Sequence, residues 1–336
     1  MSPDSGNEAA NAGCTACRRK GRACEDGKVI ESAYVLGIDI GGTNFRFGLV
    51  DENNQLRDYE QVGTQRVFGG GKEALDCLET AVREYCVKHL QERMPGAVSI
   101  GFPSTINRER TVVLQTPNID AISDHFPVVE RLRERLGIPV FINRDVNNLL
   151  HFDLYDQHIE HYGTVCGIYF GTGIGNAVMV DGKILIGAHG VASELGHLPV
   201  YGNTRICACG NESCLETLIS GVALKKMQEE KFPETPIGDL FAEHAGAPEL
   251  KQFVRGMAQA AAAEENLFDP DCLVIGGGLV LMKDFPKEEF ERAVHHFTRK
   301  PYPETEIEIR YARPNQNNGV IGAGIYAHKC QEGQKQ

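Results

Sequence analysis

One histidine and three cysteines lie close together in the middle of the chain. Their spacing, H-x9-C-x-C-x4-C, runs from His197 through Cys207 and Cys209 to Cys214. One imidazole and three thiolates match the number and softness of ligands in a closed tetrahedral zinc site. The alternative is a set of buried free cysteines beside a core histidine, but such cysteines have no reason to cluster within eight residues. The pattern therefore predicts a structural zinc ion.

Two carboxylates flank this cluster. Glu194 lies three residues before His197, and Glu216 lies two residues after Cys214. A zinc ion would hold the loop between them rigid. We therefore expect the loop to present two acids and a histidine to a polar ligand.

Two glycine-rich turns follow apolar runs and are candidates for phosphate binding. Glycine permits close approach and left-handed backbone, so such a turn can direct N–H groups at a phosphate. The candidate positions are Asp39, Gly41, Gly42, Thr43 and Asn44 in the first turn, and Gly171, Thr172, Gly173 and Gly175 in the second. Asp39 would lie near a metal ion that accompanies the phosphates. A strand is expected after the second turn, which excludes a dinucleotide-binding fingerprint.

Each glycine turn by itself is often only a hairpin, whereas two that face each other are a more specific pattern. A third cluster, Gly276, Gly277 and Gly278, ends an apolar run. It would let a flat adenine ring pass close to the backbone, or it is only a tight turn between a strand and a helix.

Asp145 is the best candidate for a general base. Phosphoryl transfer to an alcohol needs a carboxylate that orients the hydroxyl and accepts its proton. Asp145 follows the apolar run at 140–143 and lies between the two glycine turns in sequence. An aspartate in such a position is often a helix N-cap, but the neighbouring motifs favour the catalytic interpretation.

The elements that must position these residues alternate between strands and helices. Strands are expected at 34–40, 44–50, 97–101, 140–143, 165–170, 176–180 and 272–275, and helices at 74–90, 127–136, 215–231, 249–268, 287–298 and 319–328. Such alternation predicts an α/β fold. A strand, a glycine turn and a second strand occur at Gly37–Val50 and again at Gly167–Val180, so we expect two related halves with a cleft between them.

Composition narrows the class of protein. The chain has 336 residues, 42% of them hydrophobic, which is enough for two domains. A net charge of −12 argues against a nucleic-acid partner. No apolar run approaches the ~20 residues of a membrane span, and the polar start of the chain lacks the apolar core of a secretory signal. Eleven clustered cysteines suit a reducing compartment, so we expect a cytoplasmic protein.

Residues 1–33 lack apolar periodicity and are expected to be a disordered arm. The arm contains Cys14, Cys17 and Cys24 among basic residues, a spacing similar to the first half of a fungal binuclear zinc cluster. The second half is missing, since the next cysteine is Cys77. We therefore favour a loosely metal-binding or inert tail over a DNA-binding one.

Together these motifs resemble the ROK family (repressor, open reading frame, kinase) of sugar kinases and sugar-responsive repressors. The resemblance covers about residues 34–327. It rests on D-x-G-G-T at Asp39–Thr43, G-x-P-S at Gly101–Ser104, T-P-N at Thr116–Asn118, R-D-V-N at Arg144–Asn147, G-T-G-I-G at Gly171–Gly175, E-x-G-H at Glu194–His197, C-x-C-G-x4-C-L-E at Cys207–Glu216 and the glycine triplet at Gly276–Gly278.

The resemblance implies an actin-like ATPase (ribonuclease H-like) fold with two lobes around a central cleft. The first lobe would span 34–143 and be completed by the helix 319–328, and the second would span 144–318 with the zinc-binding loop. ATP and Mg²⁺ would bind between Asp39 and the glycine turns. Asp145 would be the general base on the 6-hydroxyl of a sugar. The other sugar-binding groups implied are Asn118, Arg144, Glu194, His197 and Glu216, and zinc would be held by His197, Cys207, Cys209 and Cys214. Dimers are common in the family, so a homodimer is compatible with this chain.

The chain departs from the family at Arg144, where most ROK kinases carry asparagine. An arginine has five hydrogen-bond donors and no acceptor, so its hydrogen bonds to ring hydroxyls would differ from those of asparagine. Alternatively, Arg144 pairs with a carboxylate. This pattern is most similar to the allose kinases of the family, which implies D-allose as substrate. Glucose and N-acylmannosamine are the alternative sugars. A sugar-responsive regulator without catalysis is the alternative class, but the residues before Tyr34 show no two-helix apolar pattern for a DNA-binding domain.

Overall fold

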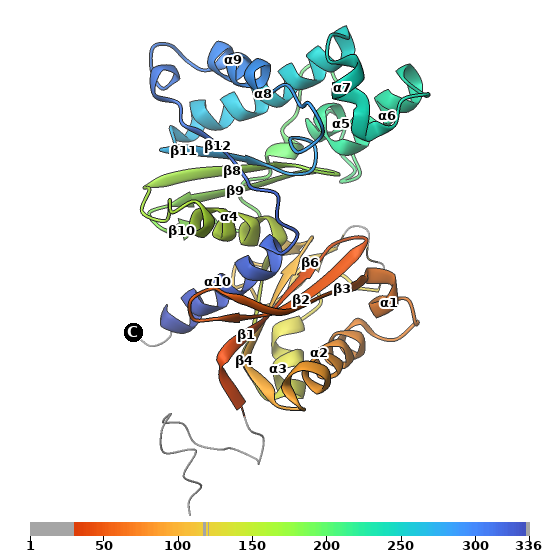
Figure 1. Cartoon of the computed structure of the whole chain (residues 1–336), viewed down its shortest axis with the longest axis vertical. Coiled ribbons are helices and arrows are strands. Elements are labelled where there is room, and N and C mark those ends of the chain that lie inside the picture. Colours follow the sequence, from red (N-terminus) through yellow and green to blue (C-terminus); the bar gives the residue numbers. More distant parts are fainter. Residues whose placement is uncertain (1–29, 117–118, 120, 334–336) are drawn as a thin grey trace, which may run out of the picture.

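The structure is a computed structural model that describes residues 30–116, 119 and 121–333 (Figure 1). It contains two five-stranded sheets that follow one another along the chain. The N-terminal lobe is defined here as the first sheet with its helices, and the C-terminal lobe as the second sheet with its helices. Within the described part of the chain, no helix combines the length and hydropathy needed to cross a membrane.

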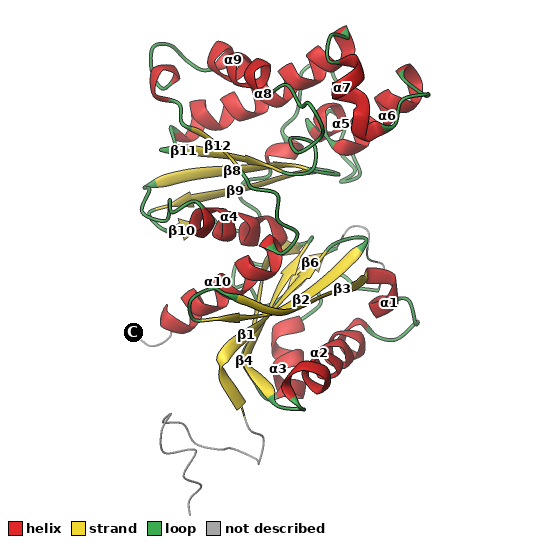
Figure 2. Ribbon diagram, viewed as in Figure 1, coloured by secondary structure: helices red, strands yellow, loops and turns green. Residues whose placement is uncertain are grey.

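The first sheet has the strand order β3-β2-β1-β4-β7. Its strands are β1 (Ile30–Ile40), β2 (Asn44–Asp51), β3 (Leu56–Gly63), β4 (Met94–Phe102) and β7 (Val140–Arg144). β1, β2 and β3 pair antiparallel, and β4 and β7 continue the sheet parallel to β1. Helices α1 (Thr64–Phe68), α2 (Ala74–Leu90) and α3 (Val128–Leu136) pack on this sheet (Figure 2), and a short ribbon joins β5 (Thr105–Ile106) to β6 (Val113–Gln115).

The second sheet repeats this topology in the order β10-β9-β8-β11-β12. Its strands are β8 (Thr164–Phe170), β9 (Ile174–Val180), β10 (Lys183–Ile184), β11 (Cys272–Gly276) and β12 (Ile309–Tyr311). Here too three antiparallel strands are followed by two parallel ones. The expectation of two related halves is therefore confirmed for the sheets.

The outer face of the second sheet carries most of the remaining helices (Figure 1). They are α5 (Glu216–Ile219), α6 (Gly221–Lys231), α7 (Leu240–His244), α8 (Pro248–Phe268) and α9 (Lys287–Phe297), with single 3-10 turns at Leu195–His197, Ile237–Asp239 and Glu304–Glu306. Buried side chains of α8 and α9 form one core with those of β8 and β11.

Two helices lie between the sheets: α4 (Asp145–Asp156) and α10 (Asn318–Gly333) (Figure 1). The two helices pack against each other. α10 also crosses β1, β2 and β4 of the N-terminal lobe, while α4 contacts β9 of the C-terminal lobe. The last helix of the chain therefore packs on the first sheet.

Three elements differ most from the expected ones. β1 begins at Ile30, four residues before the expected start, while residues 1–29 of the expected arm, with its three cysteines, lie outside the described residues. The single helix expected at 215–231 is two helices, α5 and α6. Ser220 separates them because its extended backbone interrupts the helix and its side chain accepts a hydrogen bond from the Ala223 N–H at 3.3 Å, as an N-cap does. The last helix extends to Gly333 rather than His328.

Candidate active site

The two candidate catalytic carboxylates lie at the same edge of the first sheet. Asp39 is the register partner of Gly101 on β4, and Gly101 is the partner of Asn143 on β7. Because these three strands are parallel, their carboxyl ends meet at one edge. Asp145 follows two residues after Asn143, so the sheet brings it to the side of Asp39.

Asp145 is the first residue of α4, and its environment favours proton uptake near neutral pH. Its Oδ1 accepts a hydrogen bond from the Val146 N–H at 2.7 Å. Burial raises the pKa of Asp145 to about 7, and the negative charges of Asp39 and Glu194 add to this effect, whereas the Val146 N–H and the Arg144 charge oppose it. A carboxylate with such a pKa is suited to general base catalysis.

Asp39 is held by an arginine on the neighbouring strand. Arg46 Nη1 lies 2.8 Å from Asp39 Oδ2, and both side chains are largely shielded from solvent. Burial nevertheless raises the pKa of Asp39, because it outweighs the opposing effect of Arg46. The N-terminus of α10 also approaches this carboxyl group: a Cβ on Gly319 would lie 2.9 Å from Asp39 Oδ2. The positive end of a helix dipole thus lies near the acid.

The first glycine turn joins β1 to β2 directly beside Asp39. It is closed by a hydrogen bond from the Gly41 N–H to the Asn44 carbonyl at 2.8 Å, and the Thr64 hydroxyl donates to the Gly41 carbonyl at 2.6 Å. Thr43 and Gly42 lie at the tip of this turn. The turn predicted from the sequence therefore lies where expected, between two antiparallel strands.

The second glycine turn joins β8 to β9 in the corresponding place of the C-terminal lobe. The Gly171 N–H donates to the Gly173 carbonyl at 3.0 Å, and the Gly221 N–H at the start of α6 donates to the Gly171 carbonyl at 2.8 Å. A Cβ on Gly173 would lie 3.0 Å from Glu216 Oε2, so this turn adjoins one of the carboxylates that flank the cysteines. Thr172 belongs to the same turn, whereas Gly175 is the second residue of β9 and pairs with Tyr169.

The third glycine cluster packs against the second. The Leu279 N–H donates to the Phe170 carbonyl at 3.0 Å. Gly277 has φ +92°, and a Cβ there would meet the backbone of Phe170. A tight turn after β11 accounts for Gly277. Gly276 is the last residue of β11, and a Cβ there would lie 2.7 Å from the ring of Tyr169, its partner on β8.

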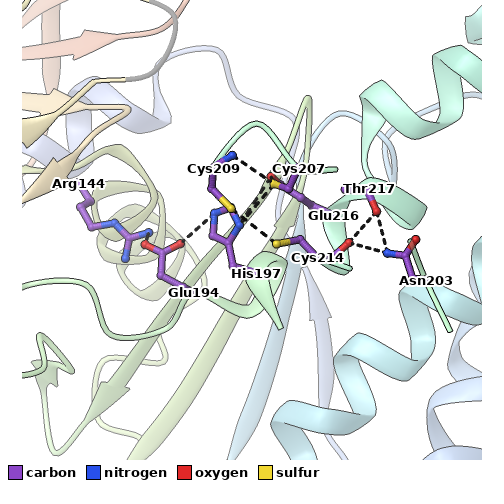
Figure 3. A network of polar contacts seen from close by, with 9 residues as sticks. All are labelled: Arg144, Glu194, His197, Asn203, Cys207, Cys209, Cys214, Glu216 and Thr217. Carbon is purple, nitrogen blue, oxygen red and sulfur yellow. Dashed lines mark hydrogen bonds and ion pairs between the residues drawn. The ribbon is translucent and has the colours of Figure 1, made fainter. Parts of the chain in front are cut away.

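The histidine and the three cysteines expected to bind zinc converge (Figure 3). One ligand atom from each of His197, Cys207, Cys209 and Cys214 lies within 4.8 Å of all the others. Cys209 Sγ is 3.6 Å from Cys214 Sγ, and Cys207 Sγ is 3.7 Å from His197 Nδ1. A tetrahedron with Zn–S bonds of about 2.3 Å has edges of about 3.8 Å. The donor set and its spacing therefore fit a tetrahedral zinc ion.

Tight turns place these ligands. His197 ends the 3-10 turn that begins at Leu195, and Cys207 both donates its N–H to Asn211 at 2.8 Å and accepts from the Gly210 N–H at 2.9 Å. The Cys209 N–H points at Cys207 Sγ across 3.5 Å.

Glu194 and Glu216 lie on opposite sides of the His197 ring (Figure 3). Glu194 Oε2 is 3.8 Å from Nε2, and Glu216 Oε1 is 3.8 Å from Nδ1. The ring nitrogen that faces the cysteines is Nδ1, so Nε2 stays directed toward Glu194. His197 can therefore ligate a metal with one nitrogen and contact a ligand with the other.

Arg144 pairs with protein groups. Its Nη2 lies 2.7 Å from Glu194 Oε1 (Figure 3). Its Nη1 donates to the Ala192 carbonyl at 3.0 Å. Of the two interpretations of this arginine, the structure shows the ion pair. Asn118, another candidate for sugar binding, lies outside the described residues.

Sequence reasoning missed Arg46. Arg46 lies between two buried phenylalanines on β2, and this alternation indicates that its side chain faces away from the core. It was not recognised because the register that sets it opposite Asp39 emerges only from the strand pairing.

A family model described as "ROK family" matches residues 35–330. A glucokinase of Streptomyces coelicolor is 30% identical over 322 residues, which cover 88% of this chain and 97% of that protein. An N-acetyl-D-glucosamine kinase of Haemophilus influenzae is 29% identical over 310 residues, covering 85% and 97%. The crystal structure of a ROK family glucokinase from Streptomyces griseus in complex with glucose and AMPPNP matches with a TM-score of 0.73 and 25% identity over 88% of this chain and 99% of that one. The expected actin-like ATPase fold is thereby confirmed.

Proposed function

The chain belongs to the ROK family, and from this premise we propose that it is an ATP-dependent hexose kinase that phosphorylates the 6-hydroxyl of D-allose. Kinase activity is supported by the glucokinase and N-acetyl-D-glucosamine kinase among its relatives. The single observation that carries the proposal is the position of Asp145, a carboxyl group with a pKa of about 7 at the sheet edge beside Asp39.

In the proposed reaction Asp145 accepts the proton of the sugar 6-hydroxyl. The hydroxyl oxygen forms a bond to the γ-phosphorus of ATP, and the bond from that phosphorus to the bridging oxygen breaks, which leaves ADP. Positioning and electrostatic stabilisation account for most of the catalysis in phosphoryl transfer. A correctly placed base contributes about 10²–10⁴-fold.

Asp39, Arg46 and the two glycine turns would hold the phosphates and Mg²⁺. The N–H groups of Gly42, Thr43 and Asn44 in the first turn, and of Thr172 to Gly175 in the second, are the proposed phosphate donors, and Gly276 to Gly278 would border the adenine. Bound Mg²⁺ supplies neutralisation of phosphate charge. An acid beside a glycine turn and a helix N-terminus is a donor set of the kind that such an ion and its phosphates require.

Glu194, His197 and Glu216 are the proposed acceptors and donors for ring hydroxyls, together with Asn118. Zinc would be held by His197 and the three cysteines, where it supplies a rigid anchor for the loop that carries both glutamates. The metal would thus act on sugar affinity through the placement of these side chains.

D-allose is proposed because Arg144 replaces the asparagine of most ROK kinases in a pattern similar to allose kinases. Glucose, N-acetylglucosamine and N-acetylmannosamine are the competing substrates. The eleven clustered cysteines support a cytoplasmic protein, the net charge of −12 argues against a nucleic-acid partner, and the family supports a homodimer.

The test is ATP consumption with Mg²⁺ by the purified protein, with the four sugars assayed side by side. A kcat/KM for D-allose at least tenfold above the others supports the full proposal. A higher kcat/KM for another sugar would support kinase activity but refute D-allose as the substrate. Sugar binding without turnover of any of the four would instead favour a regulator without catalysis.

A further inference from the structure

The segment 185–194 belongs to the C-terminal lobe by sequence but lies against the N-terminal lobe. It follows β10 and leads into the turn that ends at His197. We call this segment the strap. Its Gly190 has φ +85°, and a Cβ there would collide with the Ile106 carbonyl and lie 2.7 Å from the Asn107 carbonyl carbon. The strap therefore touches the backbone that follows β5, with no room for a side chain.

A second contact fixes the strap two residues further along. Arg144 ends β7, a strand of the N-terminal lobe, and it directly precedes Asp145. One guanidinium binds the strap twice, through the Ala192 carbonyl at 3.0 Å and the Glu194 carboxylate at 2.7 Å. The Arg144 side chain is only 11% exposed, so solvent screens this ion pair less than a surface pair.

We propose that Arg144 and Gly190 anchor the strap to the N-terminal lobe and thereby hold Glu194 in place relative to Asp145. Arg144 is on this view a positioning residue that acts through Glu194. The consequence for substrate binding rests on the proposed function, whereas the anchoring itself does not.

The charges around the strap support this arrangement. The negative charge of Glu194 raises the pKa of Asp145, whereas the positive charge of Arg144, which forms an ion pair with Glu194, lowers it. With Oε1 of Glu194 engaged by Arg144, Oε2 remains directed toward His197. Glu194 then presents one oxygen, in one orientation, to a ligand hydroxyl. An asparagine at position 144 is neutral and shorter, so it cannot provide both contacts.

Two substitutions test the anchor from its two sides, and each has a matched control. Arg144→Asn removes both contacts of Arg144 with the strap. Its control is Arg83→Asn. Arg83 also donates to one carboxylate, that of Glu79, and to one backbone carbonyl, that of Arg135, both at 2.8 Å and far from the strap. Gly190→Ala introduces the collision; Gly182→Ala is its control, because Gly182 has φ +75° but nothing within 4 Å of its Cβ position.

The first measurement is hydrogen–deuterium exchange of the ligand-free protein, which requires no catalytic activity. The amides of Ala192 and His197, which donate to Ile186 at 3.1 Å and Glu194 at 3.0 Å, report on the strap and the turn after it. We expect exchange at 186–197 to rise at least tenfold in Arg144→Asn and Gly190→Ala, and to stay within twofold in both controls. Unchanged exchange in Arg144→Asn would overturn the proposal whether or not the protein is a kinase.

The second measurement is the steady-state kinetics with the sugar that the wild type prefers. We expect Arg144→Asn to raise the KM for sugar at least tenfold while the KM for ATP stays within threefold, and Arg144→Lys to recover part of the loss because an ammonium group can keep one of the two contacts. Equal increases in both KM values, or no recovery by lysine, would mean a general structural defect and contradict the positioning role. If the wild type phosphorylates no hexose, only the proposed function is refuted. The anchoring of the strap is tested independently by the hydrogen–deuterium exchange.

Discussion

Arg46 stands directly opposite Asp39 in the antiparallel ladder of β1 and β2, and its Nη1 lies 2.8 Å from Asp39 Oδ2. The pair lies at the start of the first glycine turn. A cation is therefore present beside Asp39 before any metal or phosphate arrives. A metal ion that binds Asp39 would compete with Arg46, which would then be free to approach a phosphate.

Replacing Arg46 by alanine is expected to lower both stability and catalysis. The substitution leaves a largely shielded carboxylate without its partner, which costs about 1–3 kcal/mol in unfolding free energy. We also expect kcat to fall at least tenfold, because the cation that pairs with Asp39 beside the first glycine turn is lost. Urea unfolding and steady-state kinetics measure the two effects.

Arg57→Ala is the control for Arg46, because Arg57 lies on β3 and bonds the Tyr34 hydroxyl instead of an acid. A kcat of Arg46→Ala equal to that of Arg57→Ala would show that Arg46 has no part in the reaction.

Asp145→Asn should nearly abolish turnover and spare binding. The amide keeps the shape of the side chain but cannot accept a proton, so kcat should fall by about 10²–10⁴-fold. Calorimetric affinities for sugar and for Mg-ATP should stay within threefold of those of the wild type. Substantial residual turnover would exclude Asp145 as the base.

The rate should depend on pH through the ionisation of Asp145. Burial holds the pKa of this group at about 7, and the reaction needs the ionised form. We expect kcat/KM to be half-maximal near pH 7, to level off at higher pH, and to fall about tenfold per pH unit at lower pH. Mg²⁺ and other cations near the carboxylate favour its ionised form, so the acid limb of kcat should lie at lower pH than that of kcat/KM.

Incubation of the protein at low pH, followed by assay at pH 8, controls for acid unfolding. A kcat/KM that stays constant from pH 5.5 to 8 would contradict the assignment of this limb to Asp145.

Removal of one thiolate should release zinc. Cys209→Ala leaves three ligands, so we expect the zinc content measured by mass spectrometry to fall well below one ion per chain. The melting temperature should fall, and the KM for sugar should rise because Glu194 and Glu216 lose their common anchor. Cys330→Ala is the control, since this cysteine lies on α10 away from the cluster. Full zinc content in Cys209→Ala would refute the four-ligand site.

Much of the fold is encoded in local patterns. The helix expected at 74–90 has these bounds in the structure, because most of its apolar residues recur at helical spacing and are buried in the core of the N-terminal lobe. The helix α4 was not predicted. Its polar residues Asn147, Asn148 and His151 are buried between the sheets, so apolar periodicity is not visible in its sequence.

The site was predictable where spacing in sequence determines spacing in the structure. The ligands from Cys207 to Cys214 lie within one short loop, and each glycine turn joins two adjacent strands. The contact partners of Arg144 were not predictable, because Ala192 and Glu194 lie about fifty residues away in sequence. Their approach depends on how the strap crosses to the other lobe, which no local pattern specifies.

The packing of α10 on β1, β2 and β4 has a consequence for synthesis on the ribosome. The first sheet is complete in sequence at Arg144, but one of its faces stays uncovered until Asn318 and the residues after it have emerged. At roughly 5–20 residues per second, that interval lasts on the order of ten seconds or more. During this time the nascent N-terminal lobe exposes apolar surface, so the half of the protein that is made first is the half that finishes folding last.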